Sequence, residues 1–110
     1  MYVYDEANNL AKAIQESKEY KEYKKAKEEL ESIPEMKEKV NNFEKIRYEA
    51  QVLAFQGKNA DEEKMKKLQE MYDILMKESK IKDYFDIEVR FNIMLADVNK
   101  IISESVKDLI

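Results

Sequence analysis

The sequence predicts an all-α protein, an elongated antiparallel helical bundle with a central helical hairpin and a long C-terminal helix. Three observations support this prediction. The 110 residues include only one Gly and one Pro, whereas the turns and edges of a β-sheet would need more of both. Apolar residues recur at steps of three and four along most of the chain. Charged residues make up 40% and hydrophobic residues 44% of the total, which fits long helices.

The first helical region is predicted over residues 3–31, with an irregularity at Glu16-Ser17-Lys18. Ser17 either caps a second helix or lies inside one long helix, and the sequence leaves both alternatives open. The two apolar series on either side of Ser17 are Val3, Ala7, Leu10, Ala11 and Ile14, then Tyr20, Tyr23, Ala26 and Leu30.

The next helix is predicted over residues 33–56. Ser32 can accept a hydrogen bond from the backbone amide of Glu35 while the Glu35 side chain reaches back, and Pro34 falls in the first turn, where no amide donor is needed. Gly57 should end the helix, because glycine adopts the left-handed conformation without strain. The apolar seam, with a heptad-like spacing, comprises Met36, Val40, Phe43, Ile46 or Arg47, Ala50 and Leu53.

A helix over residues 60–78 completes the hairpin, whose tip is Gly57-Lys58-Asn59. Asn59 or Asp61 can cap this helix. Its seam is Met65, Leu68, Tyr72 and Leu75, with Met71 and Met76 beside it. Methionines at this spacing can offer an adaptable docking surface but more often belong to a core.

The last helix is predicted over residues 80–108 and should open at Ser79. Its apolar arc is wide, so we expect contacts on more than one side. We expect one domain over residues 1–110, and a symmetric homodimer that covers the remaining apolar surface. The arc consists of Tyr84, Phe91, Leu95, Val98 and Ile102, which share a seam with Glu88, then Ile87, Met94 and Ile101, and finally Phe85, Val89 and Ile93.

The residue types that the sequence lacks exclude most catalytic chemistry. Without Cys or His there can be no thiolate nucleophile, imidazole base or Cys-ligated metal cluster, and a single Gly cannot form a phosphate-binding loop. Carboxylates are numerous, but on helices this charged almost any pair spacing occurs by chance. We therefore expect no enzyme and no cofactor; a carboxylate-bound divalent metal is a weaker alternative.

Charge and hydropathy point to a cytoplasmic protein that does not bind nucleic acid. The net charge is −4 with acids and bases interspersed, whereas nucleic acid needs a basic stripe. Lysines around Tyr20 and Tyr23 superficially resemble an RNA-stacking patch, but neighbouring glutamates cancel it. No signal peptide precedes the first helix, and no run of 18 apolar residues predicts a membrane span. A direct nucleic-acid-binding module remains the alternative function.

Arg47 and Arg90 are the only Args among 20 basic residues, and both fall in or beside apolar seams. Arginine suits buried or interfacial ion pairs, because its planar fork binds a carboxylate through two donors. The candidate partners are Glu88 for Arg90, and Glu44 or Glu49 for Arg47. The candidate interaction or dimer surfaces are therefore Phe43, Ile46, Arg47, Ala50 and Leu53 in the hairpin, and Glu88, Arg90, Phe91 and Asn92 in the last helix.

Three stretches together resemble the YlbF/YmcA family of bacterial helical regulatory proteins, including its YheA-type members. They are Leu10-Ala-Lys-Ala-Ile14 with Ser17-Lys-Glu-Tyr20 and Tyr23-Lys-Lys-Ala26-Lys27; Glu49-Ala-Gln51-Val-Leu53 leading to Gly57; and Tyr84-Phe-Asp-Ile-Glu88-Val-Arg90-Phe-Asn92 with Leu95-Ala-Asp97-Val-Asn99-Lys-Ile-Ile102. By this resemblance the motif residues are Ser17, Tyr20, Tyr23 and Gly57.

The resemblance implies a helical, dimeric protein that acts through protein–protein contacts. Characterised relatives belong to a complex that modulates the endoribonuclease RNase Y, with effects on messenger RNA maturation, competence, biofilm formation and sporulation. Some carry cysteines that hold an iron–sulfur cluster. This sequence has no Cys, so that cofactor does not carry over, and the chain is most similar to the Cys-free YheA type. A family member with an unrelated function is therefore a further alternative.

Overall fold

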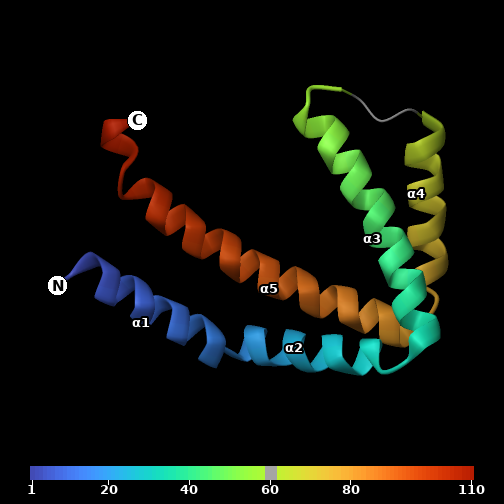
Figure 1. Ribbon diagram of the computed structural model, residues 1–110, viewed down its shortest axis with the longest axis horizontal. Helices are drawn as coiled ribbons and strands as arrows, with labels where there is room; N and C mark the ends of the chain where they lie inside the picture. The colour runs from blue at the N-terminus through green and yellow to red at the C-terminus, as the bar shows by residue number, and fades with distance from the viewer. Residues whose placement is uncertain (59–61) are drawn as a thin grey trace. The chain divides into compact units, whose positions relative to one another are not determined.

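The structure is a computed structural model that describes residues 1–58 and 62–110. Within these ranges it consists of helices without any strand (Figure 1), so the predicted all-α class is confirmed. The elements are α1 (Val3–Glu16), α2 (Lys18–Glu31), α3 (Pro34–Phe55), α4 (Glu62–Leu75), α5 (Ser79–Glu104) and a short 3₁₀ helix, η1 (Lys107–Leu109). None of the described helices is both long enough and apolar enough to cross a membrane.

The chain divides into two compact units. Unit 1 comprises Met1–Lys27 together with Tyr84–Ile110, and unit 2 comprises Glu28–Asp83. Helices α2 and α5 therefore contribute residues to both units. We predicted one domain over residues 1–110; the division into two compact units does not test this, so it stays a prediction.

Ser17 separates α1 from α2, which decides between the two alternatives for the first helical region. Its hydroxyl donates a hydrogen bond to the carbonyl of Ile14 at 2.6 Å and accepts one from the backbone N–H of Tyr20 at 3.1 Å. The backbone of Ser17 is extended, with φ −68° and ψ 153°. The side chain thus satisfies an amide in the first turn of α2, as an N-cap does.

Replacing Ser17 by alanine should destabilise the protein by about 1 kcal/mol, because the first turn of α2 loses its side-chain acceptor. Urea unfolding followed by circular dichroism measures the change. Ser17→Asn, which can still accept this bond, should retain most of the stability. Equal stability of the alanine variant and the wild type would contradict the capping role.

The capping box predicted at Ser32 and Glu35 is wrong. The Ser32 hydroxyl donates to the carbonyl of Glu29 at 2.6 Å, and the residue that precedes α3 is Ile33, which makes no side-chain cap bond. Ser32 is one residue too far from the helix to cap it, so its hydroxyl bonds to the last turn of α2 instead. Pro34 begins α3, as expected of a residue without an amide donor.

Gly57 ends α3 as predicted, with a positive φ of 76°. The N–H of Lys58 donates to the carbonyl of Leu53 at 2.8 Å, and the N–H of Gly57 donates to that of Ala54 at 3.1 Å. These two bonds form a Schellman motif, which requires a left-handed residue at this position.

Gly57→Ala should cost about 1 kcal/mol of stability, because a residue with a Cβ is strained in the left-handed region. No atom lies within 4 Å of a Cβ built at this position, so a steric clash should add nothing. Gly57→Asn should lose less, since asparagine tolerates this conformation. Thermal unfolding of the three proteins side by side measures the order, and an alanine variant as stable as the wild type would refute it.

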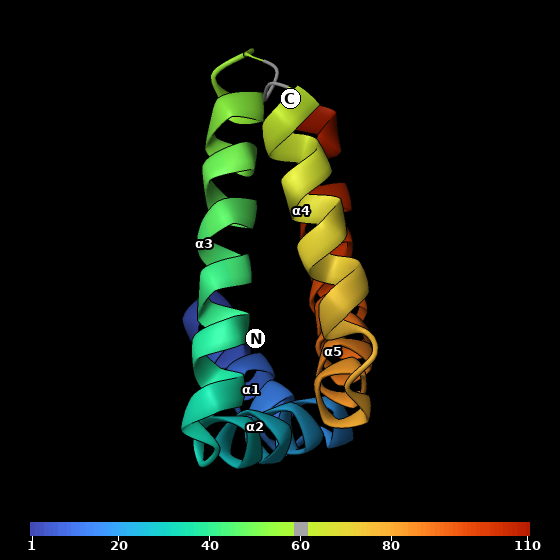
Figure 2. The ribbon, with the colours of Figure 1, turned by 90° about the vertical axis from the view of Figure 1, so that its right-hand side faces the viewer.

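In unit 2, α3 and α4 form the predicted antiparallel hairpin, visible in Figure 1 and from the side in Figure 2. The rings of Phe43 and Tyr72 pack with their centroids 6.0 Å apart. The predicted caps Asn59 and Asp61 lie outside the described residues. The buried apolar side chains of this unit are Leu30, Val40, Phe43, Leu75 and Ile81.

Two predicted helix ends differ from the structure. Helix α4 ends at Leu75 and α5 ends at Glu104, rather than at residues 78 and 108. After α5 the Ser105 hydroxyl donates to the carbonyl of Ile102 at 2.6 Å. This bond satisfies one of the last carbonyls of the helix, beyond which the chain turns into η1.

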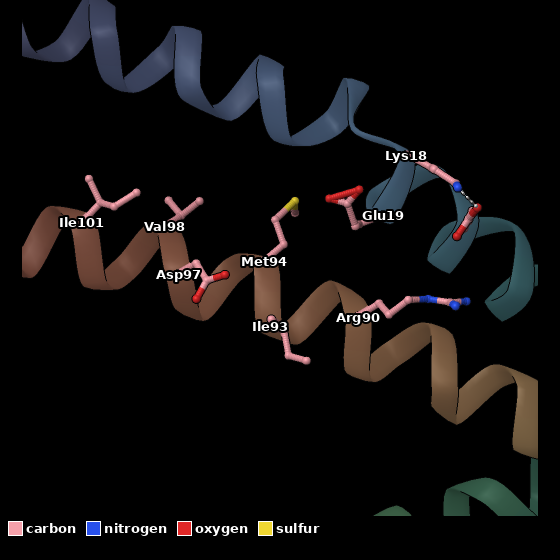
Figure 3. Close-up of a pocket in the computed structure, with 9 residues that line it drawn as sticks. Lys18, Glu19, Arg90, Ile93, Met94, Asp97, Val98 and Ile101 are labelled. Atoms are coloured by element: carbon pink, nitrogen blue, oxygen red, sulfur yellow. Dashed lines mark ion pairs between the residues drawn. The ribbon is translucent and has the colours of Figure 1, made fainter.

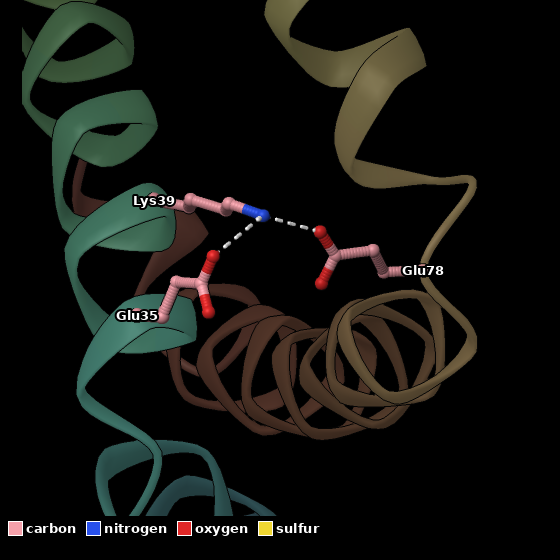
Figure 4. Close-up of polar contacts among 3 residues, drawn as sticks. All are labelled: Glu35, Lys39 and Glu78. Carbon is pink, nitrogen blue, oxygen red and sulfur yellow. Dashed lines mark hydrogen bonds and ion pairs between the residues drawn. The ribbon is translucent and has the colours of Figure 1, made fainter.

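Among the described residues of unit 2, ion pairs link α3 to α4 and to the segment that follows α4. Lys39 Nζ lies 2.6 Å from Glu78 Oε1 and 4.0 Å from Glu35 (Figure 4). The hydrogen bond to Glu78 raises the pKa of Lys39, so this contribution to stability is lost as the pH rises above about 10.5. Nearer the hairpin tip, Lys64 Nζ lies 3.0 Å from Glu49 Oε2, and that hydrogen bond lowers the pKa of Glu49.

The Glu49–Lys64 pair should make the hairpin sensitive to acid. A carboxyl whose pKa is lowered on folding stabilises the folded state above its unfolded pKa, near 4.5, and this contribution is lost as the pH falls through the folded value. Glu49→Gln should therefore show a smaller loss of urea midpoint between pH 6 and pH 3 than the wild type. Parallel pH profiles would contradict this coupling.

Candidate interaction surfaces

Aromatic residues join the start of α2 to the middle of α5 in unit 1. The ring of Phe91 lies 5.2 Å from that of Tyr23 and 6.4 Å from that of Tyr20, measured between centroids. Tyr23 also packs on Tyr84, at 5.8 Å. Residues later in α2 meet residues earlier in α5, so the two segments run antiparallel. Three of the motif residues therefore have a structural role. Tyr20 and Tyr23 pack against α5, and Ser17 caps α2.

Glu88 is the buried polar residue of this cluster, only 7% exposed. Its Oε2 accepts a hydrogen bond from the Tyr23 hydroxyl at 3.2 Å, and that hydroxyl lies 3.5 Å from the hydroxyl of Tyr84. The predicted pairing of Glu88 with Arg90 is therefore wrong, because residues two apart on a helix point to different sides. Phe91 is half-buried, whereas Arg90 and Asn92 are exposed.

An open groove of about 560 Å³ follows α5 in unit 1 (Figure 3). Met94, Val98 and Ile101 point toward α1 and the start of α2, whereas Ile93 points to the other side of α5. Lys18, whose Nζ lies 3.7 Å from Glu22, stands at one end of the groove. Arg90 and Asp97 also line it. The groove thus combines apolar side chains with charges of both signs.

Helix α1 buries none of its residues. Its apolar series runs at helical spacing, yet Val3 is 74% exposed and Leu10 is 36% exposed. On α5, Val89 and Ile93 are 53% and 56% exposed. Unit 1 therefore presents apolar surface that its own helices do not cover.

The hairpin seam predicted as an interaction surface is only partly exposed. Phe43 is 4% exposed and belongs to the core. Arg47 pairs with Glu44 at 3.9 Å and lies 5.5 Å from the Phe43 ring centroid, while Glu49, the other candidate partner, binds Lys64. Ile46, Ala50 and Leu53 are half-buried.

A groove of about 400 Å³ runs along the hairpin. Arg47, Ala50 and Ala54 of α3 line it on one side, and Met65 and Leu68 of α4 line it on the other. Met65 is 49% exposed. The hairpin thus offers a mostly apolar groove with one guanidinium at its edge.

A second apolar surface of α3, which we call the α3 stripe, was missed by the sequence reasoning. It consists of Tyr48, Val52 and Phe55, at positions i, i+4 and i+7, which share one side of a helix. Tyr48 is 66% and Phe55 is 95% exposed. The sequence contains this i, i+4, i+7 spacing, but the apolar residues that face α4 recur with an equally regular helical spacing and were chosen instead.

The described residues do not bring three or more Asp or Glu side chains together in a way that could hold a metal ion. The side chains gathered at the surfaces above are apolar residues and charged residues of both signs. Such surfaces can bind another protein through apolar contact and charge pairing.

Comparisons with known proteins agree with the fold. A family model described as "Control of competence regulator ComK, YlbF/YmcA" matches residues 3–107. A UPF0342 protein of Symbiobacterium thermophilum is 36% identical over 94% of this chain and 93% of its own length. A UPF0342 protein of Alkalihalophilus pseudofirmus is 33% identical over 97% and 91%. Neither name states an activity.

Among solved structures, a protein of unknown function (DUF964) from Bacillus stearothermophilus is similar with a TM-score of 0.83. The alignment covers 97% of this chain and 94% of that one, at 18% sequence identity. At this identity the likeness concerns the fold alone.

Proposed function

The chain belongs to the YlbF/YmcA family, and from this membership we propose that it is a non-enzymatic adaptor that acts in the cytoplasm by binding other proteins. The family's description names control of the competence regulator ComK. By the resemblance described above, the pathway is messenger RNA processing linked to RNase Y, together with the developmental responses that depend on it.

The observation that carries this proposal is the exposure of the α3 stripe. Large aromatic side chains exposed two helical turns apart on one helix face are costly in water, and apolar surface of this kind marks protein-binding sites. Tyr48 and Phe55 are 66% and 95% exposed. Tyrosine and other aromatic residues are also enriched at the centres of protein interfaces. We assign the α3 stripe to a partner of the RNase Y complex.

Self-association is the second part of the proposal. Unit 1 leaves apolar residues of α1 and α5 uncovered, and a homodimer is the commonest closed assembly that covers such surface. The adaptor is then a dimer with two copies of the α3 stripe.

The proposal is tested by affinity capture from native lysate of the organism that makes the protein, followed by identification of the captured proteins. The wild-type chain should enrich RNase Y or proteins that co-purify with it. The double variant Tyr48→Asp with Phe55→Asp should lose this enrichment at least tenfold, because two carboxylates replace the apolar anchors. Asn41→Asp with Asn42→Asp, exposed positions earlier on the same helix, makes the same charge change and should leave the capture intact.

Equal capture by the stripe variant and the control would overturn the assignment of the α3 stripe. Failure of the wild-type chain to enrich any RNase Y component would overturn the proposed pathway. Salt-dependent binding of RNA by the purified chain would favour a nucleic-acid-binding function instead.

A further inference from the structure

One face of α5 carries exposed residues of alternating charge around an apolar centre. We call it the α5 stripe, and its residues are spaced so that they lie along one side of the helix. At its centre, Ile93 is 56% exposed, and Val89 beside it is 53% exposed. The members of the α5 stripe, all exposed, are Asp86, Val89, Arg90, Ile93, Asp97 and Lys100.

The charges of the α5 stripe are reversed in sign on the two sides of Ile93. Going toward the N-terminus, a cation at Arg90 is followed by an anion at Asp86; going toward the C-terminus, an anion at Asp97 is followed by a cation at Lys100. Turning the helix end for end about Ile93 therefore places each charge within one residue of the position where a charge of opposite sign stood. A surface with this property is complementary to itself.

We propose that two copies of the chain pair through the α5 stripe, with their α5 helices antiparallel and a two-fold axis beside Ile93. In a two-fold interface the same patch is used on both copies, and every contact occurs twice. Arg90, three residues before Ile93, then faces the second copy's position four residues after it, which is Asp97. Asp86 and Lys100, each seven residues from Ile93, face each other in the same way.

The alternating charges specify the direction of pairing. In a parallel pair each residue would face its own copy, so that Arg90 would oppose Arg90 and Asp97 would oppose Asp97, which is unfavourable. The antiparallel pair instead gives four ion pairs of opposite sign around a central Ile93–Ile93 contact. Charge complementarity of this kind selects register and orientation more than it adds affinity.

The pairs assigned to the dimer have no equivalent within one helix. Arg90 and Asp97 are about 10 Å apart along the axis, at 1.5 Å per residue, whereas side chains on a helix meet at three or four residues' separation. Within the part of the chain that the structure describes, no carboxylate lies within 4.0 Å of the Arg90 guanidinium. An arginine beside apolar residues on an exposed face suits an interfacial ion pair.

Helix α2 borders the same surface where Lys18, Glu19 and Glu22 line the groove. Lys18 is paired with Glu22 in the monomer, 3.7 Å apart. These side chains form a charged rim on the side of α5 that carries Arg90 and Asp97, whereas Ile93 points to the other side of the helix (Figure 3). A second α5 seated over Ile93 would contact apolar side chains at its centre and would be bordered by this charged rim on one side, as charged rims border the centres of protein interfaces.

The test is a charge swap on the purified full chain, with the dimer dissociation constant measured by sedimentation equilibrium. Arg90→Asp places an anion opposite Asp97 in each of the two symmetric pairs, and Asp97→Arg places a cation opposite Arg90. Either change turns two exposed pairs from attraction to repulsion and should weaken the dimer about tenfold. The double variant Arg90→Asp with Asp97→Arg should return the constant to within about threefold of wild type, because both pairs are restored in reversed form.

Lys25→Asp is the matched control, since it makes the same change of net charge at an exposed position of α2 and should leave the dimer unchanged. Circular dichroism verifies that every variant keeps its helices. A monomeric wild type, or a double variant no tighter than the single ones, would overturn the proposal. Rescue by the swap cannot come from an unrelated partner, because that partner would keep its original charges.

This inference rests on the self-association in the proposed function, but the two are tested separately. Sedimentation uses the purified chain without any partner, and the capture experiment uses variants of the α3 stripe on unit 2. If the double charge-swap variant does not restore the dimer, the binding of RNase Y components is still decided by the capture experiment. If the capture experiment finds no RNase Y component, the dissociation constants measured by sedimentation are unaffected.

Discussion

Replacing Phe43 by alanine is expected to destabilise the protein by about 3–5 kcal/mol, because a buried ring is removed and the surrounding side chains close the cavity only in part. Phe43 is 4% exposed and packs on Tyr72 at 6.0 Å. Domains of this kind have total stabilities of about 5–15 kcal/mol. The variant should therefore unfold at a much lower urea concentration, measured by circular dichroism.

Tyr48→Ala is the matched control for Phe43→Ala, because it also removes an aromatic side chain from α3. Tyr48 is 66% exposed, so its loss should change stability by less than about 0.5 kcal/mol. If the two variants were equally stable, Phe43 would not belong to the core, and its original assignment to an interaction surface would return.

Removing the hydroxyl of Tyr23 is expected to cost about 1–3 kcal/mol, because the buried Glu88 loses a hydrogen-bond donor. In the wild type that hydroxyl lies 3.2 Å from Glu88 Oε2. Tyr23→Phe keeps the ring contacts with Tyr84 and Phe91, so the change isolates the hydrogen bond. Urea unfolding at neutral pH gives the difference in free energy.

Tyr20→Phe provides the comparison for Tyr23→Phe. Tyr20 packs on the same Phe91 ring, at 6.4 Å, but it is half-exposed and its hydroxyl faces a smaller cost of desolvation. Its loss should change stability by less than about 0.5 kcal/mol. Equal effects of the two substitutions would mean that the Tyr23–Glu88 bond contributes nothing beyond a general effect of the hydroxyl.

Helical periodicity and glycine placement predicted the fold well. The left-handed cap at Gly57 and the first turn at Pro34 follow from restrictions on single residues, which do not depend on the rest of the fold. Ser17 and Ser32 show the limit of prediction from single residues. Both hydroxyls can bond forward to the start of the next helix or back to the end of the preceding one. Ser17 directly precedes α2 and bonds in both directions, whereas Ser32 lies one residue further from α3 and bonds only to α2. This one-residue difference is set by how the helices meet.

The candidate surfaces were harder to predict, because periodicity identifies a face without saying what lies against it. The Phe43 seam was correctly read as apolar, but it faces α4, and the exposed aromatic residues of α3 lie on the α3 stripe instead. Glu88 was offered as a partner of Arg90 because it lies on an apolar seam of the same helix. Its actual contact is Tyr23 in another helix, which no local pattern encodes.

The absence of any buried residue in α1 has a consequence for how this helix holds together. An isolated helix of its 14 residues is marginal in water, since few hydrogen bonds repay the entropy of nucleation. Its backbone amides are therefore protected from solvent exchange mainly by what packs against α1 from outside. If α1 packs against a second copy, its folding becomes concentration-dependent, and the helix orders as the assembly forms.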